Sequence, residues 1–426
     1  MIAAFGVFLL TLILVICRPR GLNIGLIALG GALVAGLLQL ISWGDVIRVT
    51  QIVWNATSAL VGIMIISAVL DQVGFFRWAA LHVARLAKND GRRLFIFTIL
   101  LSALVSTFFT NDGTVLILTP IICETVLMLG FDPRATLAFA FATGFVADTV
   151  STPLVISNLV NIMSADYFRI PFSRYALLML VPSLVSLGVS LIGLNLFYRK
   201  DLPGHFQSDN LVAPYTAIRH TNLFHMGLAV VALMLPAFFV SASRHIPVSL
   251  LIGLAAAVLL TAGAFYRAFA VGHILRTAPW HVITFSLGMY LVVYALRNAG
   301  LVDFTAGLLA RAAQNGLTAA VLATGSAAAA LSATMNNLPA TMVGILTIDA
   351  MALPAGWEEA LALANVIGSD VGPKLTPIGS LATLIWLHEL RKRGLDVDWR
   401  YYFKVGFLLT IPVLFATLLT LALVLS

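Results

Sequence analysis

The sequence predicts an all-α polytopic membrane protein, and two observations support that prediction. Of its 426 residues, 60% are hydrophobic and only 10% are charged, well below the share of about 25% charged residues in soluble domains. Apolar stretches of 17 or more residues recur at 94–110, 175–197, 223–240 and 402–425, and each approaches the ~20 residues that cross a bilayer core. Such continuous runs exclude a β-barrel, whose strands would alternate apolar and polar residues.

The first apolar run, residues 2–17, is expected to be a retained span, because it has neither a basic leader nor a small-residue cleavage site. Cys17 and Cys123 lie far apart in apolar segments, so we expect neither a disulfide framework nor a cysteine-rich metal site. The formal net charge of +7 falls in short loops between spans, which fits membrane orientation better than a nucleic-acid partner.

Residues 1–197 are predicted to form the first of two repeats. Three plain spans at 2–17, 22–41 and 53–70 come first. The apolar pieces 94–110 and 114–129 meet at Asn111, Asp112 and Gly113, which indicates a re-entrant hairpin whose tip lies near the midplane. The segment 137–163 is too rich in Gly, Pro, Asp, Ser and Asn for one regular helix, so we expect a helix broken in mid-membrane, before a plain span at 175–197.

A polar segment, residues 198–221, is predicted to be a cytoplasmic linker to a second repeat, residues 222–426, with the same order of parts. Spans begin near Leu223, Val248 and Val282. A second hairpin tip follows at residues 336–339, then a broken segment at 361–387 and a final span. The prediction is therefore about ten spans, two re-entrant hairpins and two broken helices.

The two repeats share residues at nearly constant intervals along the chain. One and the same interval separates Trp54 from Trp280, Gly62 from Gly288 and Gly74 from Gly300. The interval from Asn111 to Asn336 is one position shorter than that. The pairs Asp148 with Asp370 and Asn161 with Thr383 share one interval, which is slightly shorter again. So many matches at nearly one interval indicate an internal repeat rather than chance.

The distribution of positive charge indicates that the repeats are inverted. Five crossings per repeat is an odd number, so the second repeat lies upside down relative to the first. With both termini periplasmic, 17 of the 25 Lys and Arg residues fall in inner loops and five in outer loops, while Arg297, Lys374 and Lys404 lie in or beside spans. This asymmetry follows the positive-inside rule, and inverted repeats place a binding site at the midplane.

Charged residues deep in apolar segments cost about 2.5 kcal/mol or more, so each needs a partner or a task. The residues predicted to couple protons are Asp112, Asp148, Asp370 and Lys374. We expect Asp112 and Asp148 to line one aqueous cavity. The alternative for Asp370 and Lys374, which stand close together in sequence, is a static ion pair; Glu124 and Asp349 lie away from the tips and are expected to be structural.

Uncharged polar side chains gather at the same breaks. The predicted solute-binding residues are Asn111, Asp112, Thr114, Asn158, Asn336, Asn337, Thr376 and Ser380. Such a lining suits a small polyhydroxylated or weakly charged solute, because a donor or acceptor can face each hydroxyl without a buried charge. The alternative is that these side chains only satisfy backbone carbonyls freed at helix breaks.

Several other functions lack their motifs. No GxxxxGK[ST] phosphate loop is present, so the chain is not expected to use ATP itself, and the histidines show no HExxH spacing for a metalloprotease. We therefore expect a transporter rather than an enzyme, with no cofactor and no bound metal.

The stretches TNDGTVLILTP, GFVADTVSTPLVISNLVNIMSADYF, MNNLPATMVG and NVIGSDVGPKLTPIGSLATLIWLH resemble the ArsB arsenite and antimonite efflux transporters, and the resemblance runs nearly end to end. It implies the inverted-repeat ion-transporter fold, an elevator-type motion, and export of trivalent arsenic and antimony acids across a bacterial inner membrane in exchange for protons. Some relatives also work with a soluble arsenite-stimulated ATPase subunit, which is a possible partner here.

The residues agree with this resemblance in one respect. Capture of arsenic by soft ligands would need about three converging thiolates, and the chain has two distant cysteines. Arsenous acid is a neutral triol at cytoplasmic pH, and the Asn, Ser and Thr residues above suit its hydroxyls. Two alternatives stay open: a sodium/proton antiporter of the same superfamily, and a passive channel for the neutral acid.

Overall fold

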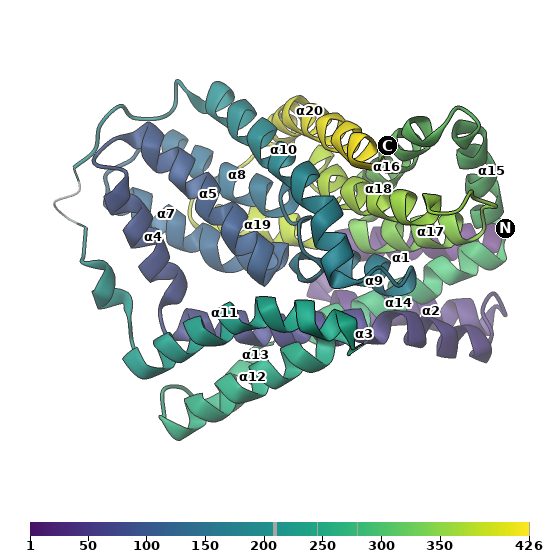
Figure 1. Ribbon diagram of the computed structural model, residues 1–426, viewed down its shortest axis with the longest axis horizontal. Helices are drawn as coiled ribbons and strands as arrows, with labels where there is room; N and C mark the ends of the chain where they lie inside the picture. Colours follow the sequence, from purple (N-terminus) through teal and green to yellow (C-terminus); the bar gives the residue numbers. More distant parts are fainter. Residues whose placement is uncertain (208–210, 245, 279, 426) are drawn as a thin grey trace.

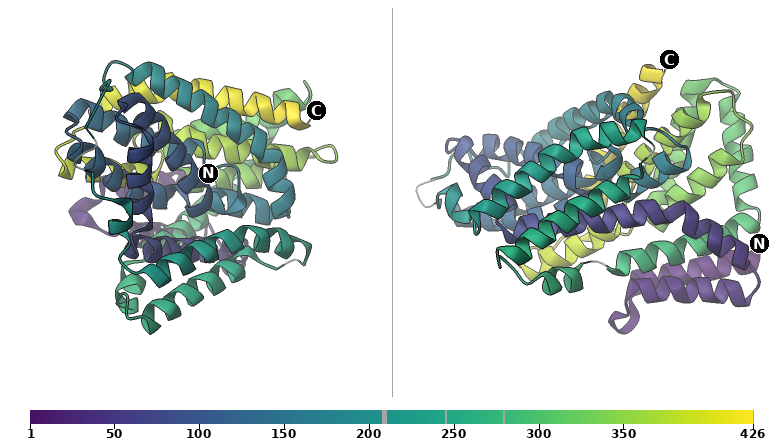
Figure 2. Two further views of the ribbon diagram at one scale, coloured as in Figure 1. Left: turned by 60° about the vertical axis from the view of Figure 1, so that its left-hand side comes forward. Right: turned by 60° about the horizontal axis from the view of Figure 1, so that its bottom comes forward.

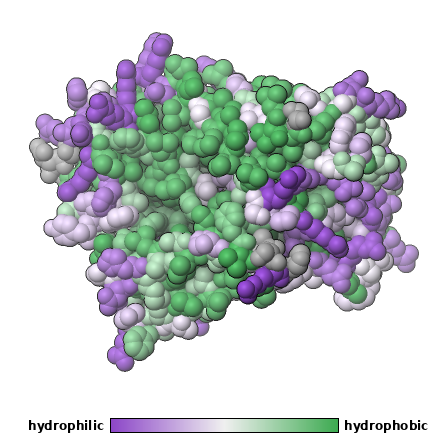
Figure 3. Space-filling view, viewed as in Figure 1, coloured by the Kyte–Doolittle hydropathy of each residue, from purple (hydrophilic) through white to green (hydrophobic). Residues whose placement is uncertain are grey.

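The computed structural model describes residues 1–207, 211–244, 246–278 and 280–425, and over these residues it is all-helical, without a β-strand. Nine helical segments in this part of the chain are long and apolar enough to cross a membrane. An apolar belt covers the middle of the face in Figure 3, and hydrophilic residues gather at its two ends. The predicted polytopic helical class is therefore confirmed.

The chain up to the linker forms ten α-helices. They are α1 (Ile2–Cys17), α2 (Ile24–Leu37), α3 (Trp43–Gln72), α4 (Phe75–Leu86), α5 (Gly91–Phe109), α6 (Asn111–Gly113), α7 (Thr119–Met128), α8 (Pro133–Thr149), α9 (Leu159–Tyr167) and α10 (Phe172–Tyr198), with short turns η1 (Pro19–Gly21), η2 (Thr114–Leu118) and η3 (Val155–Ser157). Helix α1 covers the predicted apolar run 2–17, whereas α2, with 14 residues, is shorter than the span predicted at 22–41.

The rest of the chain repeats this order. After η4 (Pro214–Ala217) come α11 (Thr221–Ser243), α12 (Val248–Phe265), α13 (Val271–Thr277), α14 (Trp280–Asn298), α15 (Leu301–Ala313), α16 (Leu317–Met335), α17 (Asn337–Asp349), α18 (Trp357–Val371), η5 (Gly372–Leu375), α19 (Leu381–Lys392) and α20 (Trp399–Leu425). Helices α11 and α12 lie side by side along one side of the molecule, next to α3 (Figures 1 and 2).

Two helical hairpins enter the molecule from opposite ends. One is α5 with α6, η2 and α7, and the other is α16 with α17; Figure 1 shows the first at the left and the second at the right. The segment η2 is a π-helical turn that is followed directly by α7, with Thr119 and Pro120 in its first turn. Pro120 explains this widening, because it has no N–H to donate to the carbonyl one turn earlier.

Both predicted broken helices are present. Helix α8 ends at Thr149 and α9 resumes in the same region at Leu159, while α18 ends at Val371 and α19 begins at Leu381. The chain between them is extended or forms a short 3₁₀ turn. Non-helical backbone at membrane depth is tolerated only where protein or a cavity surrounds it, so the breaks locate the interior of the molecule.

The backbone repeats at the interval of the Trp54 and Trp280 pair as far as the hairpin tips. Gly74 and Gly300 both precede a helix and have φ near +90°. Thr110 and Asn336 both have positive φ and cap the start of the second arm of a hairpin, at α6 and α17 respectively. Asn111 therefore corresponds to Asn337, not to Asn336 as the match of residue types suggested. The error arose because an Asn stands at each of two adjacent positions in the second tip, and residue identity cannot choose between them.

Both termini lie toward the right-hand end of Figure 1, whereas η4 and the turn into α5 lie at the left. The two hairpin tips therefore reach the interior from opposite ends of the molecule. This arrangement is the one expected of inverted repeats.

Small residues bring the second hairpin and the second broken helix together. A Cβ added to Gly368 in α18 would overlap the carbonyl oxygen of Gly325 in α16, and one added to Gly372 would overlap the backbone of Ala329. In membranes helices associate mainly through such close contact, because lipid provides no hydrophobic drive for their association.

Gly368→Ala should lower the melting temperature of the detergent-solubilised protein, because the new methyl group would collide with backbone and overpacking costs about 1–3 kcal/mol. Gly253→Ala in α12 is the control, since nothing lies within 4 Å of a Cβ there, and Ala favours a helix by about 0.5–1 kcal/mol over Gly. Equal melting temperatures for the two variants would contradict the close contact at Gly368.

Candidate functional site

Side-chain hydroxyls satisfy carbonyl groups that the helix breaks leave free. Ser106 donates to the carbonyl of Ala147, and its counterpart in the second repeat, Ser332, donates to that of Ser369 at 3.0 Å. Conversely, Ser157, which lies in the first break, donates to the carbonyl of Thr107 in the hairpin helix α5 at 2.6 Å. The equivalent carbonyl in the second repeat, that of Ala333, accepts from Thr376. The C-terminal ends at the breaks are thus capped from within the protein.

The N-terminal ends at the breaks face a common cavity of about 70 Å³. Its polar lining residues are Asp112, Asn158, His281, Asn337 and Ser380, and its apolar lining residues are Ile24, Met64, Leu116, Leu159, Val282, Leu338 and Ala382. Six helices begin here: α2, α6, α9, α14, α17 and α19. A cavity needs only about 10–15 Å³ of such volume to hold one water molecule, so this one has room for a small solute.

Helix N-termini carry unpaired N–H groups and the positive end of the helix dipole. The side chains of Asn158 and Asn336 accept hydrogen bonds from the second backbone N–H of α9 and α17 respectively. In α17 the N–H of Asn337 donates to the carbonyl of Gly379 at 3.0 Å, and Pro339 has no N–H. The hydrogen-bond donors left to the cavity are therefore the side-chain amide of Asn337 and the N–H groups of the other helices that begin there. Such a surface suits a ligand with oxygen lone pairs.

Two buried aspartates connect the two repeats just behind the cavity. The Asp148 carboxylate forms an ion pair with Lys374 Nζ at 2.9 Å and accepts a hydrogen bond from Asn111 at 2.9 Å. Asp370, its counterpart in the second repeat, accepts from Asn158 at 2.5 Å and from Ser151 at 3.4 Å. Each aspartate is 1% exposed, and each is bonded to the break of the other repeat.

Lys374 therefore pairs with Asp148 and not with Asp370, which corrects the local ion pair considered from sequence. Its ammonium also donates to Thr383 at 3.2 Å. Asp370 and Lys374 stand one helical turn apart in sequence, but helix α18 ends at Val371. The i,i+4 geometry that would join the two side chains is lost at the break.

Asp112 differs from the other two aspartates. It is partly exposed and lines the cavity, and no hydrogen bond or ion pair of its carboxylate occurs within the described ranges. It lies within electrostatic range of Asp148 and Lys374. Asp148 itself does not line the cavity, so the expected shared lining by Asp112 and Asp148 is replaced by one lining carboxylate with a buried ion pair behind it.

The eight predicted solute contacts divide into two groups. The structure places Asp112, Asn158, Asn337 and Ser380 on the cavity wall. The others engage protein: Thr114 donates to the carbonyl of Thr110, Thr376 to that of Ala333, Asn111 to Asp148, and Asn336 caps α17. For Thr376 the bonding matches the alternative in which a hydroxyl satisfies a freed carbonyl, whereas the Thr110 carbonyl also accepts the backbone N–H of Thr114 at 3.0 Å.

The sequence interpretation missed His281, because the histidines were tested only for metal-ligand spacing. A usable signal was present, since His281 follows Asn55 at the same interval at which Trp280 follows Trp54. Asn55, its counterpart in α3, lines a second cavity of about 490 Å³.

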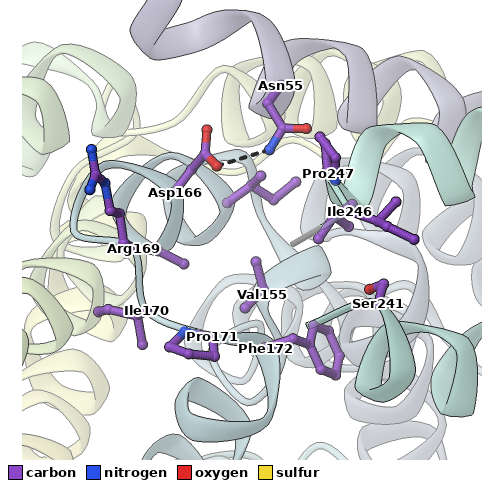
Figure 4. A pocket seen from close by; sticks show the side chains of 13 residues that line it. Asn55, Val155, Asp166, Arg169, Ile170, Pro171, Phe172, Ser241, Ile246 and Pro247 are labelled. Atoms are coloured by element: carbon purple, nitrogen blue, oxygen red, sulfur yellow. Dashed lines mark hydrogen bonds between the residues drawn. The ribbon is translucent and has the colours of Figure 1, made fainter. Parts of the chain in front are cut away.

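In this second cavity the Asn55 side chain joins α3 to α9, as Figure 4 shows, and also to α12. It donates to Asp166 of α9 at 3.1 Å and accepts from the backbone N–H of Ser249 in α12 at 3.3 Å. Helix α9 packs along α3 at this point, whereas within the described ranges α19 has no comparable packing with α14 and packs against η2 instead. Within the described residues the two repeats therefore differ at this point: α9 packs against the neighbouring span α3, and its counterpart α19 does not pack against α14 in the same way.

Three comparisons with known proteins agree with one another. The family described as "Arsenical pump membrane protein" matches residues 2–425. The chain is 48% identical to "Arsenical pump membrane protein" of Escherichia coli (strain K12), over 100% of this chain and 99% of that protein. It is 31% identical to "Putative arsenical pump membrane protein" of Bacillus subtilis (strain 168), over 93% of each chain.

Two solved structures share the fold. They are the YdaH transporter of Alcanivorax borkumensis, with a TM-score of 0.54 over 90% of this chain and 89% of that one, and MtrF of Neisseria gonorrhoeae, with a TM-score of 0.56 over 90% and 85%. Sequence identity is 14% in both cases, so these similarities bear on the fold alone.

Breaking the buried ion pair should be far more harmful than removing it. Asp148→Asn and Lys374→Met should each destabilise the protein by about 3–5 kcal/mol, because each leaves one charge buried without a partner. The double variant should recover most of the melting temperature lost by either single variant. Arg391→Met, which removes an exposed pair with Asp396, is the control and should cost about 1 kcal/mol or less; additive losses in the double variant would contradict the pairing.

Proposed function

The chain belongs to the family of arsenical pump membrane proteins, and from this membership we propose that it exports arsenite, as As(OH)₃, and the corresponding antimony acid across a bacterial inner membrane in exchange for protons. The observation that supports this proposal best is the central cavity, where helix N-termini and one unpaired carboxylate of the described chain meet.

A neutral triol matches the groups on the cavity wall. Its oxygen atoms can accept hydrogen bonds from the helix N-termini and from the amides of Asn158 and Asn337, and its hydroxyls can donate to the Asp112 carboxylate. Neither Cys17 nor Cys123 lines the cavity, so recognition through oxygen rather than through thiolates is the mode that the lining supports.

Charge balance supports coupling to protons. Asp112, Asp148 and Asp370 lie within electrostatic range of one another, and Lys374 is the cation that pairs with this group among the described residues. With every group ionised, the cluster would carry two negative charges in excess. Protons are the simplest ligands that could neutralise this excess, and Asp112 is the carboxyl that solvent in the cavity can reach.

The same cavity is less suited to sodium. Na⁺ in proteins needs several oxygen ligands, and carbonyls freed at the breaks are already engaged by Ser106, Ser332 and Thr376. The helix ends that face the cavity are the positive ends of their dipoles. These features favour an oxyacid over a metal cation as the principal solute.

The proposed orientation places both termini in the periplasm. The opposite end, where η4 and the start of α5 lie, carries Arg92 and Arg93 in the first turn of α5 and Arg199 and Lys200 directly after α10. An excess of positive charge at one end is the usual mark of the cytoplasmic side.

The decisive measurement is arsenite uptake into everted membrane vesicles, in which export appears as accumulation. Uptake should depend on an inwardly acidic proton gradient and should stop when an ionophore dissipates it. Flux that persists without a gradient would indicate a passive channel, and proton flux that depends on sodium but not on arsenite would indicate a sodium/proton antiporter.

Asp112→Asn should abolish uphill accumulation of arsenite while leaving the folded protein in the membrane, because Asn keeps the shape of the side chain but cannot exchange a proton. The matched control is Asp303→Asn, which changes an exposed aspartate of α15 and should leave uptake unchanged. Gradient-driven accumulation by the Asp112→Asn vesicles would show that another group carries the proton.

A further inference from the structure

His281 is a polar residue of the cavity wall that has no assigned task. It lies in the first turn of α14, is partly exposed, and lines the central cavity together with Asp112. Within the described ranges its imidazole ring makes no hydrogen bond, ion pair or ring contact, although its backbone carbonyl accepts from Thr284 at 3.1 Å. A polar ring on a cavity wall that bonds to no protein group is free to bond a ligand there.

The equivalent position of the first repeat shows what a purely structural role looks like. Asn55, the counterpart of His281, is 4% exposed and is bonded to both Asp166 and Ser249. Its side chain is therefore fully used in holding α9 and α12 against α3. His281 has no such partners in the described part of the chain, because α19 does not pack along α14 as α9 does along α3.

The start of α14 is held firmly, so the ring belongs to a fixed wall of the cavity. Gly25 in α2 approaches this turn so closely that an added Cβ would overlap the Thr284 side chain and lie 3.0 Å from the His281 carbonyl oxygen. The other polar lining residues lie on the hairpins and the broken helices. His281 alone of them comes from an uninterrupted span, in the part of α14 that the structure describes.

We propose that His281 is a solute-binding residue, whose imidazole forms a hydrogen bond with a hydroxyl of the oxyacid in the central cavity. This inference rests on the proposed function. A neutral imidazole offers one donor and one acceptor, which suits a triol that presents both. The solute would thereby contact the hairpin tips and α14 at the same time.

The test compares His281→Leu with His281→Gln in the everted-vesicle assay. His281→Leu should raise KM for arsenite about three- to tenfold, the effect of losing one hydrogen bond to an uncharged group, with little change in the maximal rate. His281→Gln should restore much of the affinity, because its amide can donate and accept. The control is His273→Leu, an exposed histidine of α13, which should not alter KM.

A binding measurement that needs no gradient accompanies the kinetics. Arsenite should raise the melting temperature of the purified wild-type protein and of His281→Gln, and should raise it less at the same concentration for His281→Leu. A lower maximal rate or melting temperature with unchanged KM would show that His281 serves packing or the approach of α19, and would overturn the inference. Wild-type vesicles that fail to take up arsenite would instead overturn the proposed function.

Discussion

The structure depends on one constraint: a helix interrupted within lipid leaves backbone N–H and C=O groups that must find partners inside the protein. The chain meets this constraint unequally at the two kinds of helix end. Carbonyl ends are capped by hydroxyls, as Ser106 and Ser332 show, whereas the N-terminal ends of α9, α17 and α19 line a cavity. The result is a site whose character, rich in donors and poor in free carbonyls, follows from backbone geometry.

The buried charges have a second consequence, because each of the two equivalent aspartates reaches the other repeat. Asp148 bonds to Lys374, and Asp370 bonds to Asn158 and Ser151. A buried ion pair adds little net stability over an apolar pair, since desolvation offsets the attraction. Its effect here is better described as specificity: breaking the Asp148–Lys374 contact would leave a charge without its counter-ion, and moving Asp370 away would cost its carboxyl two hydrogen bonds. The two breaks are thereby held in one relative position.

The sequence predicted the fold better than the site, for identifiable reasons. Hydropathy and polar composition located both hairpins and both broken helices, because the bilayer permits few alternatives. Side-chain partners were beyond reach: Lys374 lies close to Asp370 in sequence, yet it bonds to Asp148 in the other repeat. The role of Thr376 likewise depended on which carbonyl the break exposes. The match of His281 to Asn55 in sequence marked a polar position, but it did not show that His281 lies on the cavity wall.

The difference between Asn55 and His281 bears on how such a molecule could work. Inverted repeats let a transporter open to either side when the two halves exchange conformations. In this structure the halves are not in the same conformation: α9 is fastened to α3 through Asn55 and Asp166, while α19 lies away from α14. The Asn55–Asp166 contact therefore has no counterpart in the second repeat among the described residues. His388 follows Asp166 at the interval that relates Asp370 to Asp148, so His281 and His388 hold the positions that correspond to the bonded pair Asn55 and Asp166.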